Sequence, residues 1–201
     1  LTPVDDPSQF GIVETDVDGR VLRFVEKPQP GETESRFASA GTYVMEESTL
    51  ALMPGTEKLS IERVTFPQLV ADGGLFAMAT NDYWIDAGRP DTYVQANCDI
   101  ATQLRDPADA AVHAGAVVAN SAAVRDAVIS AQVSVGEYAQ VSNSVLLDGA
   151  VIGKGAVVER SIVMGAVGSD AHIVDCIIGP TGVVQPGQVS TGGRFPEGEI
   201  S

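Results

Sequence analysis

Glu26 and Lys27 lie side by side in residues 24–28, where a predicted strand ends at Pro28. A carboxylate can bind sugar hydroxyl groups and an ammonium group can bind a phosphate, so this pair suits a sugar phosphate. Adjacent side chains on an extended strand point to opposite faces, so we do not expect the two to pair with each other. The plainer alternative is an exposed strand end with mixed charges.

A second segment with possible chemistry is residues 83–90, which contain the only tryptophan, Trp84, and then Asp86, Gly88 and Pro90. An aspartate at a strand end offers a hard oxygen ligand for Mg²⁺, which keeps water and substrate phosphates in its shell. Alternatively, Asp86 caps the helix that begins at Pro90, and Trp84 belongs to the core. Residues 60–67 indicate only a helix start, with Ser60 as the N-cap.

The elements that must position these residues change in type along the chain. In the first half, residues 10–16 and 21–26 form a predicted hairpin around the turn Asp18-Gly19. Further strands are predicted at residues 39–45 and 76–80, and helices at residues 46–53, 61–71 and 89–104. This half is α/β in character but holds too few strands for a complete doubly wound domain.

The second half repeats. Four units begin at Ala122, Ala139, Ala156 and Ala171, so their starts are 17, 17 and 15 residues apart. In each unit the third residue is aliphatic, the sixth is small, and the seventh and eighth are aliphatic. Short strands with small residues at tight corners predict a three-sided coil, and stacked coils bury one another's aliphatic side chains. The pattern predicts a left-handed parallel β-helix of hexapeptide repeats. The alternative, a β-sandwich, has no reason to keep one phase over four units.

Composition excludes several classes of function. The chain has 201 residues, a net charge of −15 and a sequence pI near 4.3, which argue against a nucleic-acid partner. The sequence contains no apolar run of 18 residues, so it has no candidate membrane span. The two cysteines lie in different segments. We therefore expect a cytoplasmic protein without a membrane or nucleic-acid partner. His113 and His172 have no metal-ligand partner at useful spacing, which weighs against a hexapeptide acyltransferase with a catalytic histidine.

The order of several motifs resembles a known family. In sequence these are DPSQFG (6–11), EKP (26–28), SAGTYV (39–44), SIERVTFPQL (60–69) and YWIDAG (83–88). The series is similar to the later half of the nucleotidyltransferase domain of sugar-1-phosphate nucleotidyltransferases. It most resembles the mannose-1-phosphate guanylyltransferases, many of which carry a C-terminal left-handed β-helix.

The resemblance implies a role for individual residues. Gly11 would approach the sugar with its backbone, Glu26 would bind its hydroxyl groups and Lys27 its phosphate. Trp84 would wall the sugar pocket, and Asp86 would hold Mg²⁺. The family commonly has Asn-Ala-Gly where this chain has Ser39, Ala40 and Gly41, so Ser39 and Gly41 are also expected to contact the sugar, with the sugar's identity open. Phe10 stands where a tyrosine is common.

The resemblance also implies an organisation and a reaction. Residues 1–105 would be the sugar-phosphate half of the catalytic domain, residues 111–190 the β-helix and residues 191–201 a tail. The complete protein would bind a sugar-1-phosphate and a nucleoside triphosphate, convert GTP and mannose-1-phosphate into GDP-mannose and pyrophosphate, and form a homo-oligomer through the β-helix. The nucleotide-binding loop is expected upstream of Leu1, so we expect no turnover by this chain alone. A glucose-1-phosphate thymidylyl- or uridylyltransferase and a non-catalytic regulatory homologue remain alternatives.

Overall fold

The computed structural model describes residues 1–53, 55, 59–101 and 112–196. The chain divides into two compact units, Leu1–Trp84 and Ile85–Ser201. Each unit is described by itself below.

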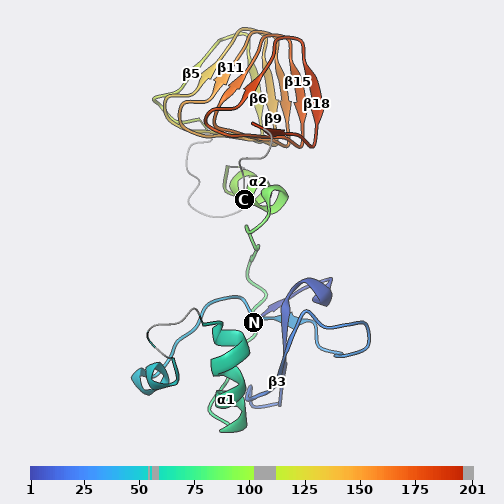
Figure 1. Cartoon of the computed structure of the whole chain (residues 1–201), viewed down its shortest axis with the longest axis vertical. Helices are drawn as coiled ribbons and strands as arrows, with labels where there is room; N and C mark the ends of the chain where they lie inside the picture. The colour runs from blue at the N-terminus through green and yellow to red at the C-terminus, as the bar shows by residue number, and fades with distance from the viewer. Residues whose placement is uncertain (54, 56–58, 102–111, 197–201) are drawn as a thin grey trace. The chain divides into compact units, whose positions relative to one another are not determined.

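The first unit is built on a four-stranded antiparallel sheet with strand order β1-β4-β2-β3. Short helices surround it, and α1 contacts β3 (Figure 1). The elements are β1 (Thr2–Pro3), η1 (Pro7–Gln9), β2 (Gly11–Thr15), β3 (Val21–Glu26), β4 (Phe37–Ala38), η2 (Glu47–Leu52), η3 (Ile61–Thr65) and α1 (Phe66–Ala71).

The β2–β3 hairpin forms as its sequence predicts. Asp16 Oδ1 accepts hydrogen bonds from the backbone N–H groups of Asp18 and Arg20, both at 2.9 Å. Gly19 takes φ +82° in this turn, a conformation that glycine adopts without strain. Ile12 and Val25 face each other across the hairpin and are buried, so the two strands share one side of a small core.

Two predicted strands of this unit are wrong. Only β4 forms near residues 39–45: Ser39 N–H still bonds to Gly11 O, but Gly41 with φ +75° then ends the extended backbone. Residues 76–80 contribute a single antiparallel bridge, between Phe76 and Arg20. Their other backbone hydrogen bonds go to Gly19 in the hairpin turn and to Leu1, and these do not extend the bridge into a strand. The predicted helix at 61–71 is present as η3, one π-helical turn, followed by α1.

In its described residues, the second unit is a parallel β-helix with one helix, α2 (Pro90–Ala101). Fifteen strands are described there, and they form three five-stranded parallel sheets, one for each side of the coil. We name each sheet by its first strand. The β5 sheet contains β5 (Val117–Val118), β8 (Ser134–Val135), β11 (Val151–Ile152), β14 (Ala166–Val167) and β17 (Val183–Val184). The β6 sheet contains β6 (Ala123–Arg125), β9 (Gln140–Ser142), β12 (Val157–Glu159), β15 (His172–Val174) and β18 (Val189–Thr191). The β7 sheet contains β7 (Val128–Ile129), β10 (Val145–Leu146), β13 (Ile162–Val163), β16 (Ile177–Ile178) and β19 (Arg194–Phe195).

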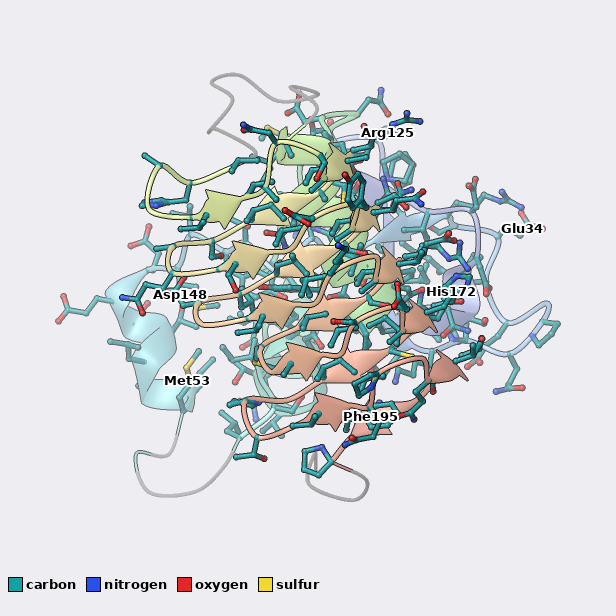
Figure 2. The ribbon with its side chains drawn as sticks, turned by 90° about the horizontal axis from the view of Figure 1, so that it is seen from above. Glu34, Met53, Arg125, Asp148, His172 and Phe195 are labelled. Atoms are coloured by element: carbon teal, nitrogen blue, oxygen red, sulfur yellow. The ribbon has the colours of Figure 1, made fainter. Side chains whose placement is uncertain are left out.

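The repeat predicted from the sequence is confirmed by the strand pairing. Val118 pairs with Val135, which pairs with Ile152, then Val167 and Val184, so successive coils are offset by 17, 17, 15 and 17 residues. Figure 2 shows the stacked coils, with Asp148 and His172 on opposite sides. The shorter step arises at the corner after β13, where Met164 and Gly165 replace four residues. A side chain on Gly165 would collide with the carbonyl oxygens of Gly179 and Gly182.

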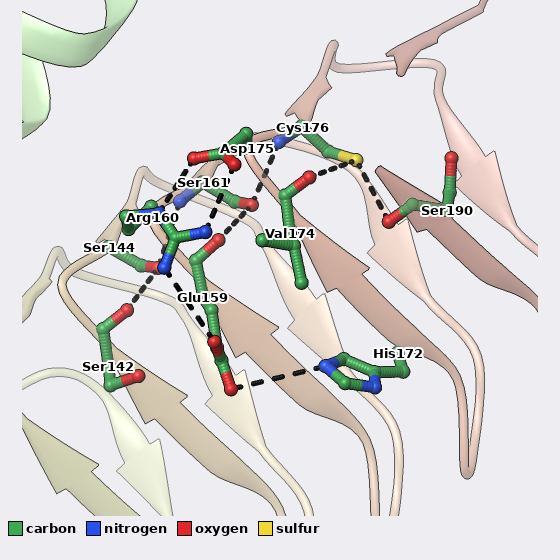
Figure 3. Close-up of polar contacts among 10 residues, drawn as sticks. All are labelled: Ser142, Ser144, Glu159, Arg160, Ser161, His172, Val174, Asp175, Cys176 and Ser190. Atoms are coloured by element: carbon green, nitrogen blue, oxygen red, sulfur yellow. Dashed lines mark hydrogen bonds and ion pairs between the residues drawn. The ribbon is translucent and has the colours of Figure 1, made fainter. Parts of the chain in front are cut away.

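The interior of the coils is apolar except along one corner. Its aliphatic core includes Ile129, Leu146, Val163 and Ile178 from the β7 sheet. At the corner between the β6 and β7 sheets the small buried residues form a hydrogen-bonded ladder (Figure 3). Ser144 Oγ accepts from Ser161 N–H at 3.0 Å, and Ser161 Oγ accepts from Cys176 N–H at 3.0 Å. Both buried serine hydroxyls of this ladder therefore have partners, as burial requires.

The bounds of the β-helix differ from those predicted. Strand β19 still pairs with β16 through Ile178 and Phe195, so the coils continue beyond residue 190 into the predicted tail. The break between the two compact units falls between Trp84 and Ile85, so α2 groups with the coils and not with the first unit. The predicted boundary between the two regions, at residues 105–111, lies outside the described residues.

Candidate functional site

The start of β2 lies close against the end of β3. Gly11 is paired with Glu26 in the hairpin, and Lys27 N–H donates to Phe10 O at 2.9 Å. A Cβ atom on Gly11 would lie 2.6 Å from the Phe24 ring and 3.0 Å from Glu26 Oε2. Only glycine fits here without moving its neighbours. Because glycine has no side chain, nothing of its own covers the backbone at this position.

Glu26 and Lys27 differ in exposure, in ion pairing and in backbone conformation. The Glu26 side chain is 29% exposed, and its Oε1 lies 3.8 Å from Nη2 of the more exposed Arg63. Lys27 is exposed and has no ion pair with any described residue. The expectation that both lie on an extended strand is wrong, because β3 ends at Glu26 and Lys27 has φ +49°. Strand alternation therefore does not set the direction of the Lys27 ammonium group.

Ser39 and Trp84 join the same cluster. Ser39 follows β4, and its N–H donates to Gly11 O at 2.9 Å. Trp84 Nε1 donates to Ala40 O at 3.1 Å, and its ring meets Phe10 edge-on with centroids 5.6 Å apart. Gly41 is exposed with φ +75°. The predicted residues of the first unit, Gly11, Glu26, Lys27, Ser39, Gly41 and Trp84, are thus brought together around the end of the β2–β3 hairpin, directly or through an adjacent residue.

Tyr43, Glu62 and Arg63 belong to this cluster although the sequence did not single them out. The Tyr43 hydroxyl lies 2.8 Å from Ser39 Oγ and donates to Glu62 Oε1 at 3.0 Å. Burial, together with the nearby Glu62 carboxylate, raises the pKa of Tyr43, so the phenol stays protonated. Glu62 therefore holds Tyr43, and through it Ser39, in place.

η3 presents Glu62 and Arg63 from a single π-helical turn, a feature that is frequent at functional sites. The expected N-cap hydrogen bond, in which the Ser60 hydroxyl oxygen would accept from a backbone N–H of the first turn, is absent. From the sequence, residues 60–67 indicated only a helix start with Ser60 as its N-cap. The partners of Glu62 and Arg63, which are Tyr43 and Glu26, are far away in sequence, so no local signal marked these two residues.

Asp86 belongs to the second unit and lies in a turn, not in the strand that was predicted. It is exposed. Its Oδ1 accepts from Gly88 N–H at 2.9 Å, while its Oδ2 has no hydrogen bond with the described residues. Gly88 permits this turn, because a Cβ atom there would lie 3.0 Å from Oδ1. Asp86 does not cap α2; instead Thr92 Oγ1 and the Arg89 backbone bond to each other at its start.

The donor set at Asp86 decides which metal it could hold. No group of three or more His, Cys, Asp or Glu side chains with metal-site geometry occurs in the part of the chain that is described. One carboxylate with an uncommitted oxygen fits Mg²⁺, which takes one or two protein carboxylates and completes its shell with water and substrate phosphates. It does not fit Zn²⁺, which takes at least three protein ligands.

Neither histidine supports an acyltransferase site within the coils. His113 Nδ1 accepts from Gly115 N–H at 2.9 Å, and His172 Nε2 lies 3.9 Å from Glu159 Oε1 on an exposed strand face (Figure 3). No connection between consecutive strands from β5 to β19 is longer than four residues. Among the described residues, no helix is long and apolar enough to cross a membrane.

Two family models match the chain. The nucleotidyl transferase model matches residues 1–103, and the GlmU-like C-terminal hexapeptide model matches residues 99–170. The first match covers the hairpin cluster and Asp86, and the second covers most of the coils.

Several curated proteins are similar to the chain. Mannose-1-phosphate guanylyltransferase from Mycobacterium tuberculosis is 34% identical over 170 residues, covering 80% of this chain and 47% of the relative. Probable mannose-1-phosphate guanylyltransferase 1 from Oryza sativa subsp. japonica is 32% identical over 217 residues, covering 92% and 58%. Mannose-1-phosphate guanylyltransferase catalytic subunit beta from Drosophila melanogaster is 33% identical over 105 residues, covering 52% and 28%. The chain therefore spans about half the length of the first two relatives.

Proposed function

Because the chain belongs to the nucleotidyl transferase family, we propose that the hairpin cluster of its first unit binds the sugar phosphate during nucleotidyl transfer. The observation that carries this proposal is the convergence of Gly11, Glu26, Lys27 and Ser39 at one end of the β2–β3 hairpin. An uncovered backbone, a carboxylate, an exposed ammonium group and a hydroxyl are the groups that a phosphorylated sugar needs.

Different residues of the cluster would bind different parts of such a substrate. Lys27 has no ion pair with the described residues, so its ammonium group is available for the dianionic phosphate. Glu26 is only loosely paired with Arg63, and its carboxylate can accept hydrogen bonds from sugar hydroxyl groups. Trp84, fixed by Ala40 and Phe10, offers a ring face or edge that can wall the sugar.

The names of the relatives support GTP and mannose-1-phosphate as substrates of the complete protein. In that reaction an oxygen of the sugar phosphate attacks the α-phosphorus of GTP. The bond from this phosphorus to the bridging oxygen of the β-phosphate breaks, and pyrophosphate leaves with the electron pair. Transfer of this kind depends mainly on positioning and on neutralising charge, which is what Lys27 is proposed to do.

Asp86 is the proposed Mg²⁺ ligand, through the oxygen that the Gly88 turn leaves uncommitted. When bound, Mg²⁺ would neutralise phosphate charge in the transition state. The Gly88 N–H bond fixes one carboxylate oxygen of Asp86 and leaves the other without a hydrogen bond to the described residues.

Ser39 makes a second sugar phosphate a candidate substrate. Its side chain is shorter than the asparagine that is common at this position in the family, and its hydroxyl already hydrogen-bonds with Tyr43. Glucose-1-phosphate, with thymidylyl or uridylyl transfer, is therefore the second candidate. We propose that the β-helix serves the assembly of a homo-oligomer, because an exposed flank of stacked coils with unpaired strand edges can pack against a second copy.

The reaction is tested on the full-length protein that contains this chain. Pyrophosphate release would be measured for GTP, dTTP and UTP, each with mannose-1-phosphate and glucose-1-phosphate. The proposal expects the highest kcat/KM for GTP with mannose-1-phosphate. A preference for dTTP or UTP with glucose-1-phosphate selects the second candidate, and no release with any pair contradicts nucleotidyl transfer.

A further inference from the structure

A cavity of about 430 Å³ lies between α2 and the last coils of the β-helix, and the proposed reaction does not use it. Its volume falls within the range of small-molecule sites, about 300–1,000 Å³. We call it the α2 groove. Among the residues that line it are Gln95, Arg160, Ile162, Asp175, Ile177 and Arg194.

The floor of the α2 groove continues an aliphatic column on the outer face of the β7 sheet. Val128, Val145, Ile162 and Ile177 occupy one position in four successive coils, and Arg194 occupies it in the fifth. α2 covers the middle of this column, where Val145 and Ile162 are buried against Val94 and Cys98. Ile177 is only half-buried and Arg194 is exposed. The uncovered end of the column therefore presents an aliphatic surface beside a guanidinium group.

The last coil leaves room for a ligand at this end. At the corner between the β6 and β7 sheets, the earlier coils carry Asn143, Arg160 and Asp175, and the last coil carries Gly192. Gly193 follows, where the earlier coils have alanine, serine or cysteine. A Cβ atom on Gly193 would lie 2.8 Å from both the Phe195 ring and Ser190 Oγ, so it would point into the coil, as the buried side chains of Ser144 and Ser161 do. The missing side chain of Gly192 is therefore what leaves the groove open at this corner.

The charges of the groove leave one cation without a partner. Arg160 binds Asp175 through two hydrogen bonds of 2.8 and 3.0 Å (Figure 3), and Arg89 Nη2 lies 3.0 Å from Asp91 Oδ2. Both carboxylates that line the groove are therefore neutralised by a neighbouring guanidinium group. The Arg194 guanidinium has no hydrogen bond or ion pair with any described residue. In a chain with net charge −15, a groove whose one uncompensated charge is positive is suited to an anion.

We propose that the α2 groove binds a small organic anion, with its phosphate or carboxylate on Arg194 and its apolar part on Ile177 and Ile162. Guanidinium groups bind both kinds of anion through paired hydrogen bonds, and the aliphatic floor favours a ligand with a ring or hydrocarbon portion. Such a ligand contacts Pro90 and Asp91 at the start of α2, so this is a candidate effector site within the second unit.

The proposal is tested by methyl NMR on the 201-residue chain with three probes: phenyl phosphate, benzoate and inorganic phosphate. Phenyl phosphate should shift the methyl signals of Ile162 and Ile177 and bind at least about fivefold more tightly than inorganic phosphate, because its ring covers the aliphatic floor. Comparison with benzoate distinguishes a phosphate site from a carboxylate site. Shifts confined to residues outside the groove, or none up to millimolar probe, would overturn the proposal.

Two variants identify the groups responsible. Arg194→Gln should weaken phenyl phosphate binding at least about tenfold, since a charge-assisted hydrogen bond is lost. Arg125→Gln, an exposed arginine of the first coil that does not line the groove, is the matched control and should bind as the parent does. Ile177→Ala should remove the preference for phenyl phosphate over inorganic phosphate. Equal affinities for parent and Arg194→Gln, with the core methyl signals of Ile129 and Ile178 unchanged, would contradict the assignment. The test does not depend on nucleotidyl transfer.

Discussion

Cys98 shows how the environment of a single residue ties α2 to the coils. Its side chain packs beside Val145 and Ile162, and its Sγ donates to Asp126 O at 3.0 Å. Burial raises the pKa of the Cys98 thiol to about 11, and the carboxylates of Asp126 and Asp99 act in the same direction. The folded state therefore favours the neutral thiol.

This shift predicts a pH dependence of stability. A raised folded pKa contributes stability that is fully present below the unfolded value, near 9, and is lost as the pH rises towards 11. Urea unfolding of the chain at pH 8 and pH 10.5 should show a larger loss of stability for the parent than for Cys98→Ala. An equal loss in both proteins would show that Cys98 does not titrate as its surroundings imply.

Side-chain chemistry identified part of the candidate site from sequence and missed the rest for a physical reason. Glu26 and Lys27 were predicted because an acid and a base adjoin at a strand end, and the structure places both at the end of the hairpin. Tyr43 and Glu62 were missed because their hydrogen bond joins residues 19 positions apart. The residues next to Tyr43 and Glu62 in the sequence contain no signal for such a distant partner.

At the scale of the elements, the short corner after β13 leaves no room for a side chain at Gly165. Gly165→Ala should destabilise the β-helix by about 1–3 kcal/mol or more, because the new methyl group meets the Gly179 and Gly182 carbonyls. Gly115→Ala is the control, since its methyl group would meet only His113 at 3.2 Å or more and Ala131 at 3.9 Å. Urea midpoints measure both. A neutral Gly165→Ala would mean that the corner relaxes easily.

The polar ladder inside the coils gives a second prediction for an element. In Ser161→Ala, the Cys176 N–H and the Glu159 carbonyl both lose their bond to the Ser161 hydroxyl. Leaving buried polar groups unpaired costs about 1–3 kcal/mol, so the free energy of unfolding should fall by that amount. Ser134→Ala, on the half-buried outer face of β8, should change it little. Similar effects of the two substitutions would count against the ladder.

Elements were predictable where the pattern repeats and less so where tertiary context decides. The coils were predicted down to the 15-residue step, because each coil needs the same inward aliphatic and corner residues to bury its neighbour. Residues 39–45 have the composition of a strand but leave the sheet at Gly41. Residues 76–80 form one bridge with the turn end of the hairpin and hydrogen bonds with Leu1, but no strand. The strand propensity of these segments does not predict either outcome.

At the scale of the whole molecule, the two compact units divide the functions that we propose. The first carries the sugar-phosphate cluster, and the second carries Asp86, the assembly coils and the α2 groove. The order of motifs predicted the family from sequence. The grouping of α2 with the coils was not predictable, because it depends on one face of α2 matching the outer column of the β7 sheet.

The central claim is that the hairpin cluster binds the phosphorylated sugar, and Lys27→Ala in the full-length protein tests it most directly. Steady-state pyrophosphate release would be measured against sugar-1-phosphate concentration. Lys154→Ala is the matched control, because Lys154 lies on the coils, paired with Glu137. The account predicts that Lys27→Ala raises the KM for the sugar phosphate at least about tenfold while Lys154→Ala leaves it unchanged. An unchanged KM in Lys27→Ala would contradict it.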